Sequence, residues 1–168
     1  MRARIAGCLY VVSVASALTN EALVHGTLLY VVSLVPILCF LIATVLLYQV
    51  FKPVNGVVAL LAACSNIVSL GFEAAEIHPG GVNAGLAFHG LYCALLGFLA
   101  IKSGFVPRIL GVLAIAAGLG WLTNISSELE QQVAPYDTVV GFIGEGALML
   151  WLLAFGPSTR RRAASGTR

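Results

Sequence analysis

The sequence contains little charge. Only 10% of its 168 residues are Asp, Glu, Lys or Arg, whereas a soluble domain typically carries about 25%. It also lacks any polar tract or charge block long enough to mark a linker or a second domain. Hydrophobic residues make up 60% of the chain. The composition therefore excludes an ordinary soluble domain and indicates a single-domain integral membrane protein.

Paired cysteines are also missing. The chain has four cysteines, and none of them forms the C-x-x-C spacing that is typical of structural zinc sites. Their scatter within apolar runs does not indicate a disulfide framework either. We interpret all four as small buried apolar residues: Cys8, Cys39, Cys64 and Cys93.

The net charge of +2 does not indicate nucleic-acid binding. The only basic cluster, Arg160–Arg162, directly follows an apolar segment. That position is typical of contact with anionic lipid headgroups rather than with phosphodiesters. The expected partners are therefore membrane lipids and an apolar small molecule, with no nucleic acid, and a homo-oligomer is compatible with the sequence.

Apolar runs divide the chain into six segments, separated by polar residues or by breakers such as Lys52-Pro53. About 20 apolar residues in a helix cross a hydrocarbon core of about 30 Å. We predict an all-α bundle of six transmembrane helices over residues 1–156, followed by a basic, disordered cytoplasmic tail over 157–168. The expected spans are 5–18 continuing toward His25, 28–50, 54–70, 82–101, 109–125 and 138–155.

The first segment has a second interpretation. Arg2 and Arg4, the apolar run that follows and Ala15-Ser16-Ala17 also fit a cleavable signal peptide. Because the run can continue as a short helix toward His25, we expect the segment to be retained in the protein.

Positive and negative charge separate along the predicted topology. Because Lys and Arg in short loops stay on the cytoplasmic side, we predict a multi-pass protein of the cell membrane with both termini cytoplasmic. The side of the membrane that holds the N-terminus contains all nine basic residues: Arg2, Arg4, Lys52, Lys102, Arg108, Arg160, Arg161, Arg162 and Arg168. The acids and histidines fall on or near the other side: Glu21, His25, Glu73, Glu76, His78, His89, Glu128, Glu130, Asp137 and Glu145. Any chemistry is therefore expected in the outer half of the bundle.

Two ionisable residues are expected inside the membrane. Glu145 lies between Gly144 and Gly146, about 10 Å into the last segment at a rise of 1.5 Å per residue, and His89 lies at a similar depth in the fourth. A carboxyl group there must be protonated or face a partner or a water-filled pocket, and an imidazole could exchange a proton with it or with a substrate. The alternatives are a hydrogen bond between helices for Glu145 and a backbone carbonyl partner for His89.

A second pair of acids ends the third segment. Glu73 and Glu76 are spaced i, i+3 and share a helical face if the helix continues that far. The candidate catalytic residues are thus Glu145, His89, Glu73 and Glu76. Together with His78, the second pair could supply ligands to a divalent metal. Acids at a helix end are more often simply solvated, and we predict no bound metal or cofactor.

Polar and aromatic residues in the outward parts of the helices are the predicted pocket lining: Asn66, Tyr92, Trp121 and Asn124. The two asparagines could instead form hydrogen bonds across a helix interface. Trp121 is also typical of packing or membrane-interface aromatics, as are Tyr136 and Trp151. Small residues four apart predict close packing of the fifth helix: Ala114 with Gly118, and Ala116 with Gly120.

Four short runs carry a family resemblance: R-I-A-G-C-L-Y at 4–10, K-P-V-N at 52–55, G-L-Y-C-A-L-L-G at 90–97 and S-G-F-V-P-R-I-L-G at 103–111. They resemble a bacterial family of small polytopic membrane proteins catalogued as a domain of unknown function. The resemblance implies a six-span helical fold with the first helix retained, and it implies no activity.

Three functions fit these features. The first is an enzyme that performs acid–base chemistry on an apolar lipid- or isoprenoid-like substrate, by cyclisation, isomerisation or hydrolysis. The second is a non-catalytic accessory or interaction protein of the membrane. The third is a subunit of an ion-coupled transporter, which a chain of this size without a detectable repeat would form as an oligomer.

Overall fold

The structure is a computed structural model, and within the part of the chain that it describes every long element is a helix and no strand occurs. The described residues are 1–23, 27–77, 79, 82–134 and 136–156. His25, His78 and the tail at 157–168, with Arg160–Arg162, lie outside them. The long helices are α1 (Arg2–Leu23), α2 (Thr27–Phe51), α3 (Gly56–Ala74), α4 (Ala84–Ser103), α5 (Arg108–Leu122) and α7 (Tyr136–Ala154).

Local signals set the helix ends. Asn55 Oδ1 accepts a hydrogen bond from the backbone N–H of Val58, and Asn83 Oδ1 accepts one from Leu86, both at 3.1 Å. Each asparagine therefore caps the N-terminus of the helix that follows it, α3 and α4 respectively. Helix α4 ends at Gly104, whose φ of 67° is a left-handed conformation that glycine adopts without a Cβ penalty.

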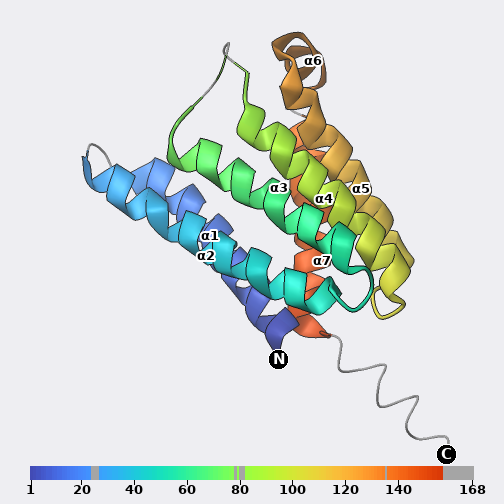
Figure 1. Ribbon diagram of the computed structural model, residues 1–168. Helices are drawn as coiled ribbons and strands as arrows, with labels where there is room; N and C mark the ends of the chain where they lie inside the picture. The colour runs from blue at the N-terminus through green and yellow to red at the C-terminus, as the bar shows by residue number, and fades with distance from the viewer. Residues whose placement is uncertain (24–26, 78, 80–81, 135, 157–168) are drawn as a thin grey trace, which may run out of the picture.

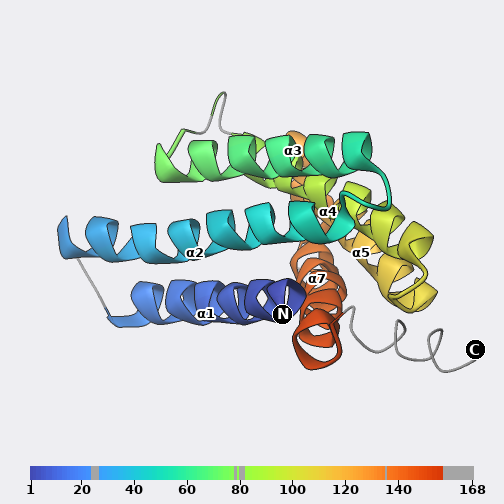
Figure 2. The same cartoon turned by 60° about the horizontal axis from the view of Figure 1, so that its bottom comes forward.

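The six long helices pack in a closed ring. Helices α1 to α5 each contact the next along the chain, α5 contacts α7, and α7 contacts α1. Figures 1 and 2 show α1 and α2 as a neighbouring pair with α3 beside α2, and α7 packed near the start of α1. At that contact, a Cβ on Gly7 would lie 2.7 Å from the carbonyl oxygen of Met149. The ring places segments from both halves of the sequence around a common interior.

Five of the helices are long and apolar enough to cross a membrane, namely α2 through Leu34–Phe51, α3, α4, α5 through Arg108–Ile125, and α7. Apolar side chains on one face of α2 are exposed at Val35, Leu38, Ile42 and Val45. Because this spacing follows one side of a helix, these side chains form a continuous apolar surface suited to lipid. The predicted membrane fold is confirmed at this level. The number of six spans is not, because α1 is a helix but is not among the five.

The predicted polar connection at 126–137 is wrong in detail. It contains a short helix, α6 (Ser127–Val133), and α7 begins at Tyr136, two residues before the predicted start. Glu, Gln and Leu dominate α6, and all three favour helices. The α-helical part of the fifth span ends at Leu122 and continues as the 3₁₀ helix η2 (Thr123–Ile125), so the predicted span 109–125 is helical to its end.

Helices α4 and α5 pack through facing glycines. A Cβ on Gly90 would lie 2.6 Å from the carbonyl oxygen of Gly118, and one on Gly97 would lie 2.5 Å from that of Gly111. The two helices run antiparallel, so glycines seven residues apart on each helix meet in two pairs. Close packing of the fifth helix is therefore present, although its Gly–Gly pairs differ from the four-residue spacing read from the sequence.

The alternating helix directions gather the described basic residues at one end of the ring. This end holds the start of α1, the α2–α3 and α4–α5 connections and the end of α7 (Figure 1). Its basic residues are Arg2, Arg4, Lys52, Lys102 and Arg108. The connection between α3 and α4, with Glu73 and Glu76, lies at the opposite end together with α6 (Figure 1).

Candidate functional site

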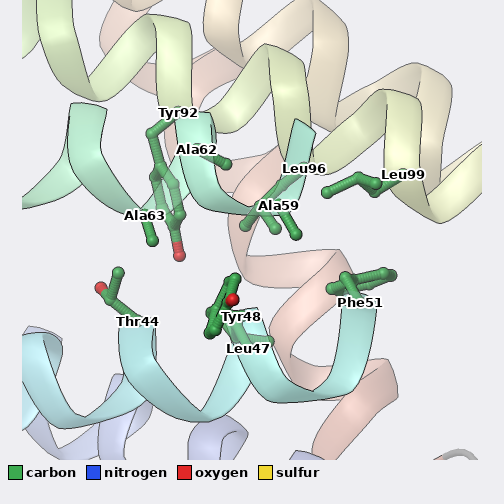
Figure 3. Close-up of a pocket in the computed structure, with 10 residues that line it drawn as sticks. All are labelled: Thr44, Leu47, Tyr48, Phe51, Ala59, Ala62, Ala63, Tyr92, Leu96 and Leu99. Carbon is green, nitrogen blue, oxygen red and sulfur yellow. The ribbon is translucent and has the colours of Figure 1, made fainter. Parts of the chain in front are cut away.

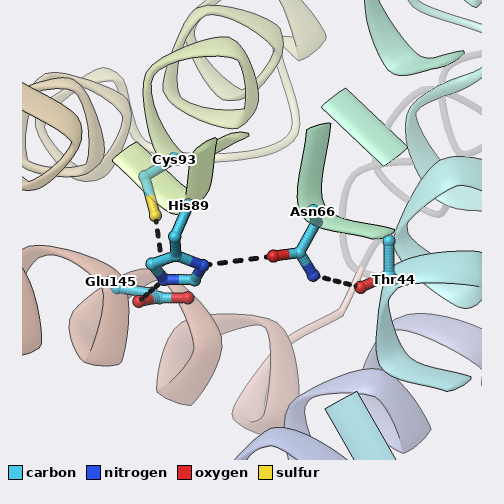
Figure 4. A network of polar contacts seen from close by, with 5 residues as sticks. All are labelled: Thr44, Asn66, His89, Cys93 and Glu145. Atoms are coloured by element: carbon cyan, nitrogen blue, oxygen red, sulfur yellow. Dashed lines mark hydrogen bonds and ion pairs between the residues drawn. The ribbon is translucent and has the colours of Figure 1, made fainter. Parts of the chain in front are cut away.

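A chain of polar contacts crosses the interior of the ring from α2 to α7 (Figure 4). The Thr44 hydroxyl donates to the Phe40 carbonyl at 2.8 Å, and Asn66 Nδ2 donates to Thr44 Oγ1 at 2.6 Å. Asn66 Oδ1 lies 3.1 Å from His89 Nδ1, and His89 Nε2 lies 3.0 Å from Glu145 Oε2. The chain links side chains from α2, α3, α4 and α7, and it places His89 and Glu145 in direct contact.

The directions of these hydrogen bonds fix the histidine tautomer. Because the only hydroxyl hydrogen of Thr44 goes to Phe40, Thr44 must accept from the amide of Asn66. Asn66 therefore presents its carbonyl oxygen to His89, and Nδ1 of the ring must carry a hydrogen. A single proton then lies between His89 Nε2 and Glu145 Oε2. It makes the pair either an imidazolium with a carboxylate or a neutral imidazole with a carboxylic acid.

The His–Glu pair is deeply buried. His89 is 8% exposed and Glu145 is 4% exposed, and Glu145 is the tenth of the nineteen residues of α7. The second carboxyl oxygen, Oε1, is buried without a hydrogen-bond partner among the described residues. An unpartnered carboxyl oxygen at this depth is costly, so its position indicates a ligand, a proton or water at this point.

Aromatic rings surround His89. The ring centroid of Phe40 lies 5.5 Å from that of His89, and the centroids of Tyr92 and Trp121 lie 5.6 Å and 6.0 Å away. The rings come from α2, α4 and α5. These ring contacts account for part of the burial of His89, which is 8% exposed.

A cavity of about 500 Å³ lies inside the ring, next to the His–Glu pair. Along α4 its lining runs from Asn83 inward to His89, so the pair lies at the inner end of the cavity. The volume is that of a typical small-molecule site. All six long helices contribute to the lining, which is mostly apolar and includes Ile37, Phe40, Leu70, Phe72, Leu86 and Phe142.

We call the region where α2 meets the α3–α4 pair the seam. From Thr44 toward Phe51, on the side away from the cavity, the seam is closely packed. Figure 3 shows Tyr92 reaching from α4 toward α2, with Ala63 beside it and Thr44 opposite. The crevice lined by these residues has no room for a water molecule. Tyr92, a predicted pocket residue, therefore packs in the closed part of the seam, although its ring also contacts His89.

Glu73 and Glu76 line the outer end of the cavity, and both are exposed. Helix α3 ends at Ala74, and Glu76 has a positive φ of 52°. The backbone N–H groups of Ile77 and Glu76 donate to the carbonyls of Phe72 and Glu73, which is a Schellman motif with Glu76 in the position that glycine usually occupies. The condition for a shared helical face is therefore not met, because α3 ends before Glu76, although both acids reach the cavity.

The remaining predicted pocket residues lie in different environments. Trp121 lines the cavity and is 6% exposed, and its Nε1 is buried with no partner among the described residues. Asn66 lies within the polar chain. Asn124 is buried, but its Nδ2 donates to the Trp121 carbonyl at 3.2 Å, and it does not line the cavity. Tyr136 is exposed at the start of α7.

The two glycines beside Glu145 have different roles. A Cβ on Gly144 would collide with the Leu113 carbonyl, so this glycine lets α7 approach α5 closely. A Cβ on Gly146 would meet nothing within 4 Å. Only Gly144 therefore allows a close helix approach, whereas Gly146 faces open space.

The cysteines do not share one environment. Cys93 is buried, but Cys8 and Cys64 are exposed and Cys39 is half-buried, so the interpretation of all four as buried is wrong. In a membrane an outward apolar face suits a cysteine as well as the interior does. Cys93 Sγ lies 3.6 Å from His89 Nε2, a contact that the sequence analysis missed. The i, i+4 spacing of His89 and Cys93 on one helix was the available signal.

Together the fold and site define a helical integral membrane protein with a buried His–Glu pair beside an internal cavity. The chain belongs to the family described as a domain of unknown function (DUF4386), which matches residues 73–156. An uncharacterized protein of Archaeoglobus fulgidus is 30% identical to it over an alignment of 123 residues, and the match covers 67% of this chain and 74% of that protein. No solved structure matches the chain. The segment matched by the family contains both members of the His–Glu pair.

Proposed function

We propose that the protein is a membrane enzyme that performs acid–base chemistry on an apolar, lipid- or isoprenoid-like molecule at His89 and Glu145. The observation that carries this proposal is the placement of the buried pair at the inner end of a cavity of about 500 Å³. A pair whose only role is to hold helices together needs no adjoining space of this size.

The geometry suits proton transfer. Asn66 holds Nδ1 of His89 in its protonated form, so the ring can exchange a proton only through Nε2, which faces Glu145. Oε1 of Glu145 is buried and has no hydrogen-bond partner among the described residues, so it is available to a polar group of a bound molecule that reaches it. Glu145 would be the group that gives or takes the proton, and His89 would hold the compensating charge. A positioned acid or base contributes on the order of 10²–10⁴ in rate.

The lining indicates the class of substrate. Phenyl and aliphatic side chains cover most of the cavity, and polar groups concentrate at its two ends, at the His–Glu pair and at Glu73 and Glu76. This pattern fits an elongated apolar molecule whose reactive double bond, carbonyl or ester lies at the inner end. Cyclisation, isomerisation and hydrolysis are the reactions that one carboxyl group and one imidazole can support there.

The orientation of the protein is part of the proposal. The end of the ring that holds Lys52, Lys102 and Arg108 would face the cytoplasm, because Lys and Arg near spans favour that side. Both termini would then be cytoplasmic in the cell membrane, with α1 as a sixth span, and the cavity would open toward the outer leaflet. Membrane lipids and the apolar substrate are the proposed partners, and self-association of the chain stays a prediction.

Untargeted mass spectrometry of membrane lipids tests the activity without a known substrate. Membranes from cells that express the wild-type chain would be compared with membranes carrying Glu145→Gln or His89→Ala at equal protein levels. Glu128→Gln, an exposed change on α6, is the matched control. We expect a lipid species to change about 100-fold or more between wild type and both site variants, but not in the control.

A non-catalytic accessory role is the second candidate, and a specific observation favours it. The polar chain joins four helices of the ring, which is what a structural network would do. Identical lipid profiles for wild type, Glu145→Gln and His89→Ala would contradict the enzyme and favour this role, with loss of stability as the main effect of both variants.

A further inference from the structure

Three potential metal ligands meet at the inner end of the cavity. His89 and Cys93 lie one turn apart on α4, and Glu145 reaches them from α7 (Figure 4). Their ligand atoms all lie within 4.8 Å of one another. His89 Nε2 is 3.6 Å from Cys93 Sγ and 3.0 Å from Glu145 Oε2. The three residues are buried, and they are separated by up to 56 positions in the sequence.

We propose that His89 Nε2, Cys93 Sγ and a carboxylate oxygen of Glu145 bind one divalent transition metal ion, with zinc the best match. Zinc accepts nitrogen, sulfur and oxygen ligands at about 2.0–2.3 Å in a tetrahedral arrangement. Ligand atoms around such an ion lie about 3.3–3.6 Å apart. The two separations that involve His89 are close to this range, and the third, between Cys93 and Glu145, is no longer than 4.8 Å. An ion would therefore fit between the three side chains after side-chain movements of up to about 1 Å.

The histidine is already held in the form that a metal requires. Coordination through Nε2 needs the hydrogen of the neutral ring on Nδ1, and Asn66 accepts that hydrogen. Thr44 fixes the orientation of Asn66 in turn. Metal-binding histidines usually donate their second ring N–H to an oxygen acceptor in this way, which orients the ring and strengthens the ligand. The hydrogen bonds from Thr44 through Asn66 to His89 would thus hold the imidazole in the orientation that metal binding requires.

Charge balance favours the site at membrane depth. A divalent ion bound by a thiolate, a carboxylate and a neutral imidazole has no net charge, so the cluster avoids the cost of an isolated ion in an apolar interior. The aromatic rings of Phe40, Tyr92 and Trp121 lie around His89 and make its surroundings largely apolar. The site also accounts for Cys93, which is the buried cysteine and the one in contact with an ionisable group.

Three protein ligands leave a fourth position open. His89 and Glu145 both line the cavity, so that position faces the space in which a molecule would bind. Three ligands and an open position are typical of catalytic rather than structural zinc sites. An ion there acts as a Lewis acid toward a carbonyl or a bound water. In the metal-bound protein the ion would take the place of the proton between His89 and Glu145, and a water at the open position would become the group that exchanges protons. The inference thus deepens the proposed function, and rests on it for the role of the metal but not for metal binding itself.

Metal content is the test. The full-length chain would be purified in detergent without chelators, and its metal would be measured by inductively coupled plasma mass spectrometry. We expect about one zinc per chain in the wild type and a loss of about tenfold or more in Cys93→Ala. Cys64→Ala, an exposed cysteine on α3, is the matched control and should keep its zinc. Equal metal content in Cys93→Ala and Cys64→Ala would overturn the proposal.

Cobalt replacement gives a readout that does not depend on a variant folding normally. Wild-type protein stripped with a chelator and loaded with Co²⁺ should show an absorption band from a cobalt–thiolate bond together with the visible bands of tetrahedral cobalt. Cys64→Ala should show the same spectrum. Absence of the thiolate band from the loaded wild-type protein would overturn the assignment of Cys93 as a ligand.

The two proposals fail separately. If Cys93→Ala keeps both its metal content and its lipid profile while Glu145→Gln alters the lipids, the metal site is wrong and the acid–base pair stands. If the wild type binds zinc through Cys93 but no lipid differs among the variants, the metal site stands and the enzyme proposal is wrong.

Discussion

The seam between α2 and the α3–α4 pair differs on the two sides of Thr44. On the side of Leu47 and Phe51 it is filled, with no room for a water molecule, whereas on the side of Phe40 and Pro36 it holds a cavity of about 500 Å³. Thr44 borders the filled half and is the first member of the polar chain that ends at Glu145. The polar chain therefore lies at the boundary between the filled half of the seam and the half that holds the cavity.

The two halves of the seam differ in how closely their side chains pack. Small residues of α3, Ala59 and Ala62, let Leu47 and Phe51 of α2 pack fully in the filled half. In the open half, polar groups at Ser69, Glu73 and His89 take the corresponding positions. The filled half can hold the ring together, so the open half is able to keep buried polar groups and an unfilled space.

The largest expected effect comes from truncating a leucine in each half. Leu47→Ala removes a side chain that is 1% exposed in the filled half and should cost about 2–5 kcal/mol of unfolding free energy. Leu70→Ala, at 5% exposed, borders the cavity and should cost less, because its side chain already lacks neighbours on one side. Equilibrium unfolding in detergent measures both, and an equal or larger loss for Leu70→Ala would contradict the comparison. Leu150→Ala, on an exposed face, is the control.

Replacing a small residue by leucine tests the same comparison by adding side-chain volume to each half instead of removing it. Ala62→Leu should cost about 1–3 kcal/mol, because the added methyl groups have no space in the filled half. Ser69→Leu adds similar groups next to the cavity and should change stability by less than about 1 kcal/mol. The same unfolding measurement compares them. Binding of a fluorescent apolar probe should weaken in Ser69→Leu alone, and unchanged binding would place the probe outside the cavity.

Removing the Asn66 amide, where the filled half of the seam meets the open half, should leave the N–H at Nδ1 of His89 without an acceptor. Asn66→Ala deprives His89 Nδ1 of its acceptor and should cost about 1–3 kcal/mol. It should also lower the affinity for zinc by about tenfold or more, because the ring loses the group that orients it. Unfolding and metal titration measure the two effects. A stable variant with wild-type metal affinity would show that the polar chain does not support the site.

The smallest effect is expected at Thr44, the end of the polar chain. Thr44→Val keeps the shape of the side chain but removes the hydroxyl that accepts from Asn66, so about 1 kcal/mol should be lost. Thr44→Ser keeps the hydroxyl and should retain the zinc affinity of the wild type, with only a small packing loss. If both variants behave alike in the metal titration, the hydroxyl does not orient Asn66.

Much of the fold follows from the sequence alone. Apolar runs and breakers predict, within a few residues, the five helices that are long and apolar enough to cross a membrane, because length and composition decide whether a segment can cross lipid. The helical start of α7 at Tyr136 and the helix α6 were missed, since polar residues near the membrane surface were read as a loop. The ring of helices could not be predicted, because helix adjacency depends on contacts between distant segments.

Only part of the candidate site could be predicted from the sequence. His89 and Glu145 stand out because ionisable residues are rare at membrane depth, and the structure brings them together at 3.0 Å. The third neighbour, Cys93, has neither C-x-x-C spacing nor a disulfide pattern, so the sequence indicated only a small buried residue at this position. Thr44 could not have been singled out, since a hydroxyl within an apolar helix is common and its importance comes from Asn66 on another helix.

An experimental structure of the wild-type protein in lipid nanodiscs tests the central claim most directly, namely that the His–Glu pair ends a site for an apolar molecule. The account predicts elongated density inside the ring, with its inner end within about 3.5 Å of Glu145 or of an ion bound beside it. A structure in which α1 and α2 pack against α3 as tightly as the filled half does, leaving His89 and Glu145 without adjoining space, would contradict it.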